Sequence, residues 1–116
     1  MQSIPRPGAE NSMSDQPVYL IANLVVNDRT EYRNYEKGFF PLLTRHDGEF
    51  LTYDDNPHTF EGAAPRQGRV ILLKFPSEGH ARRWYADPDY QALSDHRRAA
   101  TNLEFITMAR SLPARS

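Results

Sequence analysis

The chain has 116 residues, of which 39% are hydrophobic, and its 14 basic and 15 acidic side chains leave a net charge of -1. The absence of cysteine excludes a disulfide framework, a zinc–thiolate site and a catalytic thiol, and the balanced charge argues against a nucleic-acid-binding surface. No apolar run approaches the roughly 18 residues that a membrane-spanning helix needs, so the sequence predicts a soluble protein with one hydrophobic core.

Two flexible tails are predicted around a single domain at residues 18–110. Residues 1–17 are polar, rich in proline and without a hydrophobic period, so they hold too little apolar surface to offset the entropy cost of ordering. Residues 111–116 form the second tail. Because no apolar signal segment is visible, the expected location is the cytoplasm. Met13 is an alternative start of the chain.

The domain begins with a predicted strand at residues 18–26 (VYLIANLVV), whose β-branched and aromatic residues favour extended structure. Asp28 and Glu31 have the spacing of a helix-capping box, and aromatic and leucine side chains then recur at helical intervals to about His46. Pro41 is expected to kink this helix or to split it into two segments.

The middle of the domain is predicted to hold two short strands and a loop. Gly48 is the expected C-cap of the first helix, and a strand follows at residues 49–53. The turn sequence DDNP at residues 54–57 leads to a short edge strand at residues 58–62, and the loop after it ends at Gly68.

The second half repeats the pattern of strand, helix and strand. Residues 69–75 (RVILLKF) are a strongly apolar strand, and Ser77 is the predicted N-cap of the next helix. Asp87 and Pro88 end that helix and begin another, and residues 103–110 (LEFITMAR) close the domain as a strand. The order βαββαβ predicts an α+β, ferredoxin-like fold in which an antiparallel sheet carries the helices on one face.

Two of these strands are apolar on both of their faces. Alternate side chains of a strand point to opposite faces. In residues 18–26 and 69–75, both faces are too apolar for a surface exposed to solvent. Because the helices cover only one face of the sheet, another apolar surface has to cover the second face, and an identical subunit is the simplest candidate. The sequence therefore predicts a homodimer.

Several short stretches resemble a known family. The most specific runs from Trp84 to Leu93 (WYADPDYQAL), and Arg97 follows it at a fixed offset. Weaker matches are YLIA ahead of Asp28, the pair Tyr32 and Tyr35, GEFL at residues 48–51, FEG at 60–62 and LKFPS at 73–77. With these stretches the chain resembles the domain of unknown function 1330 (DUF1330) family, which belongs to the dimeric α+β barrel group of ferredoxin-like folds.

This resemblance implies a dimeric α/β barrel built from ferredoxin-like domains, and it implies no established activity. Two positions depart from the family pattern. Asp47 stands where the family usually has the first glycine of a pair, and His96 stands where an apolar residue is more typical.

Arg97 is the candidate anchor for a ligand. It shares a helical stripe with Tyr90, which places its guanidinium partly in the core, and a buried arginine needs a carboxylate from the protein or from a ligand. Glu61 is the protein carboxylate that would form a purely structural ion pair with it. Trp84 and Tyr90 would form the apolar wall of a ligand site, or would belong to an ordinary core between helix and sheet.

Polar side chains also interrupt the apolar strands. Asn23, Lys74 and, more mildly, Thr107 would line a cavity on the inward face of a barrel, or would form hydrogen bonds across a dimer interface.

Acidic and histidine residues recur around the predicted hairpin, at Asp54, Asp55, His58 and Glu61. The alternation of a strand would place His58 and Glu61 on opposite faces, so a solvated turn is the preferred interpretation and no metal site is predicted. Ser77 has a capping role and no nucleophile elbow surrounds it, so it is not interpreted as part of a catalytic triad. No cofactor motif is present in the sequence.

The sequence identifies no reaction. It favours a small homodimer that binds a small acidic or aromatic metabolite between sheet and helices, without nucleic-acid or membrane partners. The candidate ligand contacts are Arg97, Trp84, Tyr90, Asn23 and Glu61. The alternative is a cofactor-free enzyme, similar to a monooxygenase or an isomerase, which rests on fold analogy alone. A purely structural role, with side chains filling the barrel, is a third interpretation.

Overall fold

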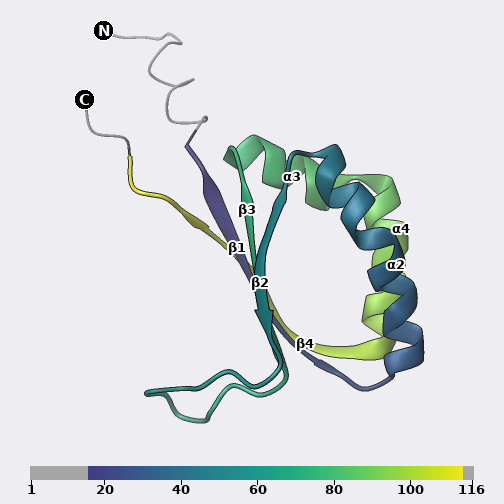
Figure 1. The fold of residues 1–116 in the computed structure, drawn as a ribbon, viewed down its shortest axis with the longest axis vertical. Coiled ribbons are helices and arrows are strands. Elements are labelled where there is room, and N and C mark those ends of the chain that lie inside the picture. Colours follow the sequence, from purple (N-terminus) through teal and green to yellow (C-terminus); the bar gives the residue numbers. More distant parts are fainter. Residues whose placement is uncertain (1–15, 114–116) are drawn as a thin grey trace, which may run out of the picture.

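A four-stranded antiparallel sheet with helices on one face forms the domain (Figure 1). The computed structural model describes residues 16–113, so most of the two predicted tails lies outside the described residues. The elements are β1 (Val18–Val26), α2 (Arg29–Arg45), β2 (Glu49–Asp54), β3 (Arg69–Phe75), α3 (Glu78–Ala86), α4 (Pro88–Ala100) and β4 (Thr101–Arg110). The strand order is β2-β3-β1-β4. This is the ferredoxin-like βαββαβ fold that the sequence predicts.

Helix α2 begins where the sequence predicts. The Asp28 side chain accepts a hydrogen bond from the backbone N–H of Glu31 at 3.0 Å, which satisfies one free donor of the first turn. The predicted split at Pro41 is wrong, because α2 runs unbroken to Arg45. Pro41 and Lys37 are both exposed, so the Lys37 carbonyl that loses its helical partner can bond to water instead.

The end of α2 corrects the prediction for Gly48. Asp47, not Gly48, adopts the left-handed conformation, with φ of 61°. The N–H groups of Asp47 and Gly48 donate to the carbonyls of Thr44 and Leu43 at 3.0 and 2.9 Å, as in a Schellman motif. Gly48 is required for space, because a Cβ there would lie 2.4 Å from Leu43 Cδ1 and 2.7 Å from Phe75 Cε1.

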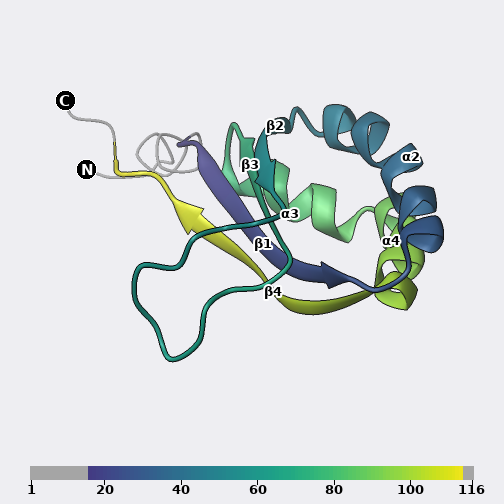
Figure 2. The same ribbon diagram turned by 60° about the horizontal axis from the view of Figure 1, so that its bottom comes forward.

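The connection between β2 and β3 is a long loop that extends away from the sheet (Figure 2). The predicted edge strand at residues 58–62 is wrong, because these residues form bends without a ladder. Pro57 and Pro65 cannot donate to a neighbouring strand, and Gly62 has a φ of 152°. The loop therefore leaves β2 as a sheet edge.

The helices of the second half begin at the predicted caps. Ser77 accepts from the N–H of His80 at 3.2 Å to start α3, and Asp87 accepts from the N–H of Asp89 at 2.9 Å to start α4. None of the helices in residues 16–113 is long and apolar enough to cross a membrane.

The core lies between the sheet and the helices. Its buried side chains come from β1 and β3 on one side and from α2, α3 and α4 on the other: Leu20, Leu24, Leu73, Phe75, Tyr32, Tyr35, Phe39, Leu42, Leu43, Trp84 and Tyr90. On the opposite face of the sheet, which we call the outer face, the strand register aligns a second apolar set: Tyr19, Ile21, Val70, Leu72 and Phe105. These side chains are only half-buried, and no described helix covers them.

Candidate functional site

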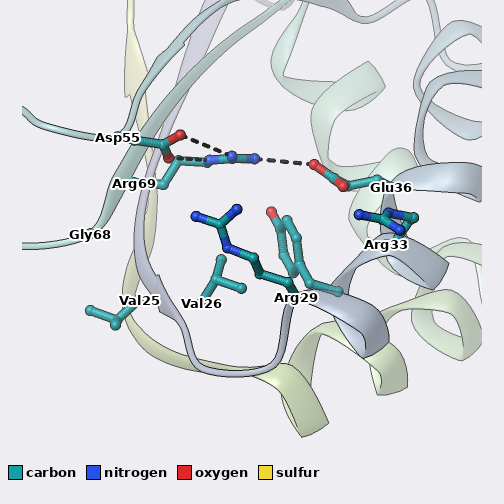
Figure 3. Close-up of a pocket in the computed structure, with 9 residues that line it drawn as sticks. Val25, Val26, Arg29, Arg33, Glu36, Asp55, Gly68 and Arg69 are labelled. Atoms are coloured by element: carbon teal, nitrogen blue, oxygen red, sulfur yellow. Dashed lines mark hydrogen bonds and ion pairs between the residues drawn. The ribbon is translucent and has the colours of Figure 1, made fainter.

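A cleft opens between α2 and the part of the sheet where β1 and β3 meet the long loop. Its outer part, which we call the mouth, has a volume of about 330 Å³. The residues that line it come from the end of β1, the first turns of α2, the loop and the start of β3 (Figure 3): Val25, Val26, Arg29, Tyr32, Arg33, Glu36, Asp55, Gly68 and Arg69.

One of the three arginines of the mouth is already paired. Arg69 donates from Nε and Nη2 to the two carboxylate oxygens of Asp55, at 2.6 and 3.2 Å, and from Nη1 to Glu36 at 3.2 Å. These hydrogen bonds raise the pKa of Arg69 and lower the pKa of the Asp55 carboxyl. The pairing fixes Arg69 as a bridge between the loop and α2.

The other two arginines of the mouth, Arg29 and Arg33, form no ion pair with any residue in the range 16–113. Figure 3 shows the Arg29 side chain reaching across the mouth toward the Asp55–Arg69 pair. Three guanidinium groups thus face two carboxylates, and the excess positive charge favours an anionic group in the mouth.

An aromatic pocket of about 150 Å³, which we call the slot, lies beside the mouth. Its walls are Tyr32, Tyr35, Glu36, Phe39, Phe40, Phe50, Tyr53, Arg69 and Ile71. It shares Tyr32, Glu36 and Arg69 with the mouth. Phe40 and Tyr53 are about half exposed at its rim, and Arg69 lies over the Tyr53 ring at 4.4 Å. Apolar cavities of about this size accept one benzene ring.

A third cavity, which we call the inner cavity, lies in the core behind the slot. It measures about 30 Å³ and shares the walls Tyr35, Phe39 and Ile71 with the slot. The hydroxyls of Tyr35 and Tyr90 meet beside it at 2.6 Å. Burial, reinforced by Tyr90, raises the pKa of Tyr35 well above its ordinary value, so this hydroxyl keeps its proton at neutral pH.

The structure brings three of the predicted ligand contacts together. Arg97, Trp84 and Tyr90 all line the inner cavity, and each is at most 2% exposed. They belong to the closed core and do not line the open cleft.

The other two predicted contacts lie elsewhere. Asn23 is fully buried, and its Nδ2 donates to the carbonyls of Gln67 and Arg69 at 2.9 and 3.1 Å, so it ties the end of the loop to β1. Glu61 is exposed in the loop and forms no ion pair with Arg97. Lys74 and Thr107 pair with Tyr19 and Ile21, which places them on the outer face and not on a cavity wall.

Sequence reasoning missed the arginines of the mouth and most of the slot. Tyr32, Tyr35 and Phe39 were predicted only as a core stripe of the first helix. One signal was available in the sequence: Phe40 lies outside the helical stripe that Tyr32, Tyr35 and Phe39 form, so it adds a large aromatic side chain beside the core face. An additional aromatic residue beside the core stripe therefore indicated an aromatic surface.

The acidic residues around the hairpin do not converge. Asp55 binds Arg69 in the mouth, while His58 lies edge-on to Phe60 with the ring centroids 4.7 Å apart. Within residues 16–113 there is no group of three metal-ligating side chains.

A wide groove between α3 and β4 has a volume of about 650 Å³. Its walls are mainly apolar, and its one charged side chain, Arg82, already donates to Glu78 at 2.7 Å. The groove therefore lacks the convergent polar groups that fix a ligand.

The family model "Domain of unknown function (DUF1330)" matches residues 17–110. No curated protein matches the chain. Among solved structures, the RPA0582 protein of unknown function from Rhodopseudomonas palustris is 16% identical, with a TM-score of 0.67 and coverage of 97% of both chains.

Two further structures support the fold. SnoaB from Streptomyces nogalater, described as a cofactor-independent oxygenase, is 16% identical, with a TM-score of 0.58 and coverage of 87% of this chain and 95% of its own. A dabb (dimeric α/β barrel) family protein with a ferredoxin-like fold from Mesorhizobium loti is 10% identical, with a TM-score of 0.52 and coverage of 85% and 98%. At these identities the likeness shows the fold alone.

Proposed function

This chain belongs to the DUF1330 family, and we propose that it is a homodimeric binding protein for a small aromatic acid. One observation carries the proposal: an aromatic slot the size of a single ring adjoins a mouth with excess positive charge, and the two cavities share Tyr32, Glu36 and Arg69 as walls. The sequence favours a ligand that is either acidic or aromatic, and the two neighbouring cavities favour a ligand that is both.

The slot suits the ring of such a ligand. Phe39 and Phe50 stand edge-to-face, with centroids 6.3 Å apart and planes at 88°, so the walls offer both the faces and the edges of rings. Aromatic pairs of this kind contribute about 0.5–1.5 kcal/mol beyond the burial of apolar area. Because Phe40 and Tyr53 are half exposed at the rim, a bound ring would also cover apolar surface that now faces water.

The mouth suits the acid group. Arg69 is held in place by Asp55 and Glu36, whereas Arg29 has no carboxylate partner among the described residues and reaches into the mouth. A guanidinium forms bidentate, charge-assisted hydrogen bonds with a carboxylate. Arg29 is therefore the proposed partner of the acid group.

Binding is a better account of the geometry than a reaction. A cofactor-free oxygenase, the activity described for SnoaB, or an isomerase would need a group that removes a proton from the substrate. Around the inner cavity the titratable groups are Tyr35, Tyr90 and Arg97, all of them hydrogen-bond donors. In the mouth, both carboxylates are bound to Arg69.

The homodimer is proposed from the outer face. Its half-buried apolar side chains lie on the side of the sheet that no described helix covers (Figure 1). A ferredoxin-like domain that pairs with a second copy through this face would form a dimeric α/β barrel.

Binding of benzoate, measured by isothermal titration calorimetry, tests the ligand class. We expect benzoate to bind, while neutral benzamide and non-aromatic acetate bind at least tenfold more weakly in the cleft. Arg29→Gln should weaken benzoate at least about tenfold, because one charge-assisted hydrogen bond contributes about 1.5–3 kcal/mol. Phe40→Ala should also weaken it, because this exposed side chain closes the rim of the slot.

The matched control is Arg83→Gln, which makes the same change of charge at an exposed position on α3, outside the cleft. This variant should bind benzoate as the parent does. Equal affinity for benzoate and benzamide, or equal losses in Arg29→Gln and Arg83→Gln, would contradict the proposed role of the mouth.

A further inference from the structure

We propose that the inner cavity is an anion site that holds one small monoanion, or one carboxylate group, against Arg97. The site goes beyond the proposed function, which uses only the slot and the mouth. It lies in the core, between the sheet and α4.

Arg97 is a buried cation without a counter-charge. It is 2% exposed, its Nε has no hydrogen-bond acceptor, and no carboxylate in residues 16–113 pairs with it. The Tyr35 ring, 5.8 Å from Arg97 Cζ, is the group that it faces. Desolvation of an unpaired ion is strongly unfavourable, so the site gains most from an anion.

Two further groups around the cavity have a hydrogen to donate. The indole N–H of Trp84 is buried and has no acceptor among the described residues. The hydroxyls of Tyr35 and Tyr90 share one hydrogen in their 2.6 Å contact, so the second hydroxyl hydrogen is free to donate to a third atom. Arg97, Trp84 and the tyrosine pair all line the same cavity.

The rest of the wall is apolar. It consists of leucine, isoleucine, alanine and phenylalanine side chains from β1, β3, β4 and α2, and it contains no aspartate, glutamate or histidine. A wall without a carboxylate, next to a fixed positive charge in a medium of low dielectric constant, favours anions over cations and neutral molecules.

The volume sets the size of the anion. A water molecule needs about 10–15 Å³ of such space, so a cavity of about 30 Å³ accepts an anion of two or three heavy atoms, such as formate, and not sulfate. The carboxylate can be a free anion or the acid end of a longer molecule whose body passes Tyr35 and Phe39, which separate the cavity from the slot.

Thermal unfolding of the full chain with formate, at constant ionic strength balanced by sulfate, tests the site. We expect the Tm of the parent to rise with the logarithm of formate concentration, because a ligand that binds only the native state stabilises it. Arg97→Met, which keeps the length of the side chain and removes the charge, should lose this rise. Arg98→Met, at the exposed neighbouring position on α4, should keep it.

A second arm uses 4-phenylbutyrate, an aryl acid with a chain. If formate has no effect and 4-phenylbutyrate raises the Tm of the parent but not of Arg97→Met, the site takes the acid end of a longer ligand. If neither acid gives a rise that depends on Arg97, the proposal is wrong.

Trp84→Phe keeps the test decisive if Arg97→Met does not fold. This change keeps an aromatic side chain and removes the indole N–H donor, so it should reduce the formate response, and an unchanged response would contradict the site. Phe40→Ala separates this proposal from the slot, because it should weaken benzoate and leave the formate response unchanged.

Discussion

Asp87 connects three structural elements through a single carboxylate. It receives hydrogen bonds from His46 at 2.7 Å and from Arg45 at 3.0 Å, both near the end of α2, and it caps α4. The His46 hydrogen bond, the N–H of Asp89 and Arg45 together lower the pKa of Asp87 to about 2. The charge of Asp87 therefore links the end of α2 to the junction of α3 and α4.

The lowered pKa predicts how stability depends on pH. In the unfolded chain the pKa of an aspartate is about 3.9. Between pH 4 and 2 the Asp87 carboxyl is therefore protonated in unfolded molecules and still ionised in folded ones. The contribution of Asp87 is present above pH 4 and is lost as the pH falls to about 2. We expect Asp87→Asn to lower the Tm at pH 7, and the difference from the parent to shrink across this window.

The substitution isolates the charge of Asp87, because asparagine also caps helices. Asp95→Asn is the control, since Asp95 is exposed and, among residues 16–113, its one ion-pair partner is Arg98, one turn away. Thermal unfolding followed by circular dichroism from pH 7 to pH 2 checks both variants. A pH-independent difference for Asp87→Asn would show that the lost contacts, and not the charge, matter.

Single residues also show where local sequence signals suffice. The caps at Asp28, Ser77 and Asp87 were predictable because a cap depends on a hydrogen bond within three residues. Asp47 was not predicted as the left-handed residue, although the family resemblance marks this position as a usual glycine. The neighbouring Gly48 is required by contacts with Leu43 and Phe75, and the contact with Phe75 cannot be seen in a local pattern.

At the scale of elements, the predicted order and, to within two residues, the bounds of the four strands agree with the structure, because the hydrophobic period follows burial. The predicted edge strand at residues 58–62 is the exception. The prediction for Pro41 failed because local sequence does not show whether an unpaired backbone group can bond to water. Pro41 does not split α2 because the carbonyl it leaves unpaired is at an exposed position. The cleft could not be predicted, because it forms only where α2, the β2–β3 loop and the start of β3 meet.

The loop between β2 and β3 is positioned by Asn23 on β1. Two hydrogen bonds from its side chain hold the carbonyls of Gln67 and Arg69, and Gly68 between them has a φ of 77° and would place a Cβ 2.3 Å from the Leu24 carbonyl. This arrangement sets the start of β3, and therefore the direction of Arg69 into the mouth.

Replacement of Asn23 by leucine should loosen this connection. We expect Asn23→Leu to lower the free energy of unfolding by about 1–2 kcal/mol, because two hydrogen bonds of about 1 kcal/mol each are lost. Amide hydrogen exchange at residues 68–70 should accelerate more than exchange in β1. Asn102→Leu, the same change at an exposed position of β4, is the control. Uniform acceleration across the sheet would contradict a local role for Asn23.

For the whole molecule, the two proposed tasks, ligand binding and dimerisation, fall on opposite faces of the sheet. The helix-covered face holds the core, the slot, the mouth and the inner cavity, all built from one chain. The outer face carries aligned apolar side chains from three strands, and none of these side chains lines the slot, the mouth or the inner cavity. Ligand binding and dimerisation should therefore be separable, so that a monomeric variant retains the cleft.

A charge on the outer face should produce such a monomer. Ile21 lies on the central strand β1, opposite Leu72 and Thr107. We expect the parent to sediment at micromolar concentration with twice its chain mass of 13.4 kDa. Ile21→Glu should sediment as a folded monomer, because a buried unpaired carboxylate in an apolar interface costs several kcal/mol. Asn34→Glu, at an exposed position on α2, should remain dimeric.

The same variant separates the two tasks of the molecule. Because Ile21 faces away from the slot and the mouth, monomeric Ile21→Glu should bind benzoate with the affinity of the parent. Loss of binding together with loss of the dimer would mean that the partner subunit shapes the cleft. A parent protein that sediments as a monomer would contradict the dimer itself, and the half-buried apolar set of the outer face would then require a different partner.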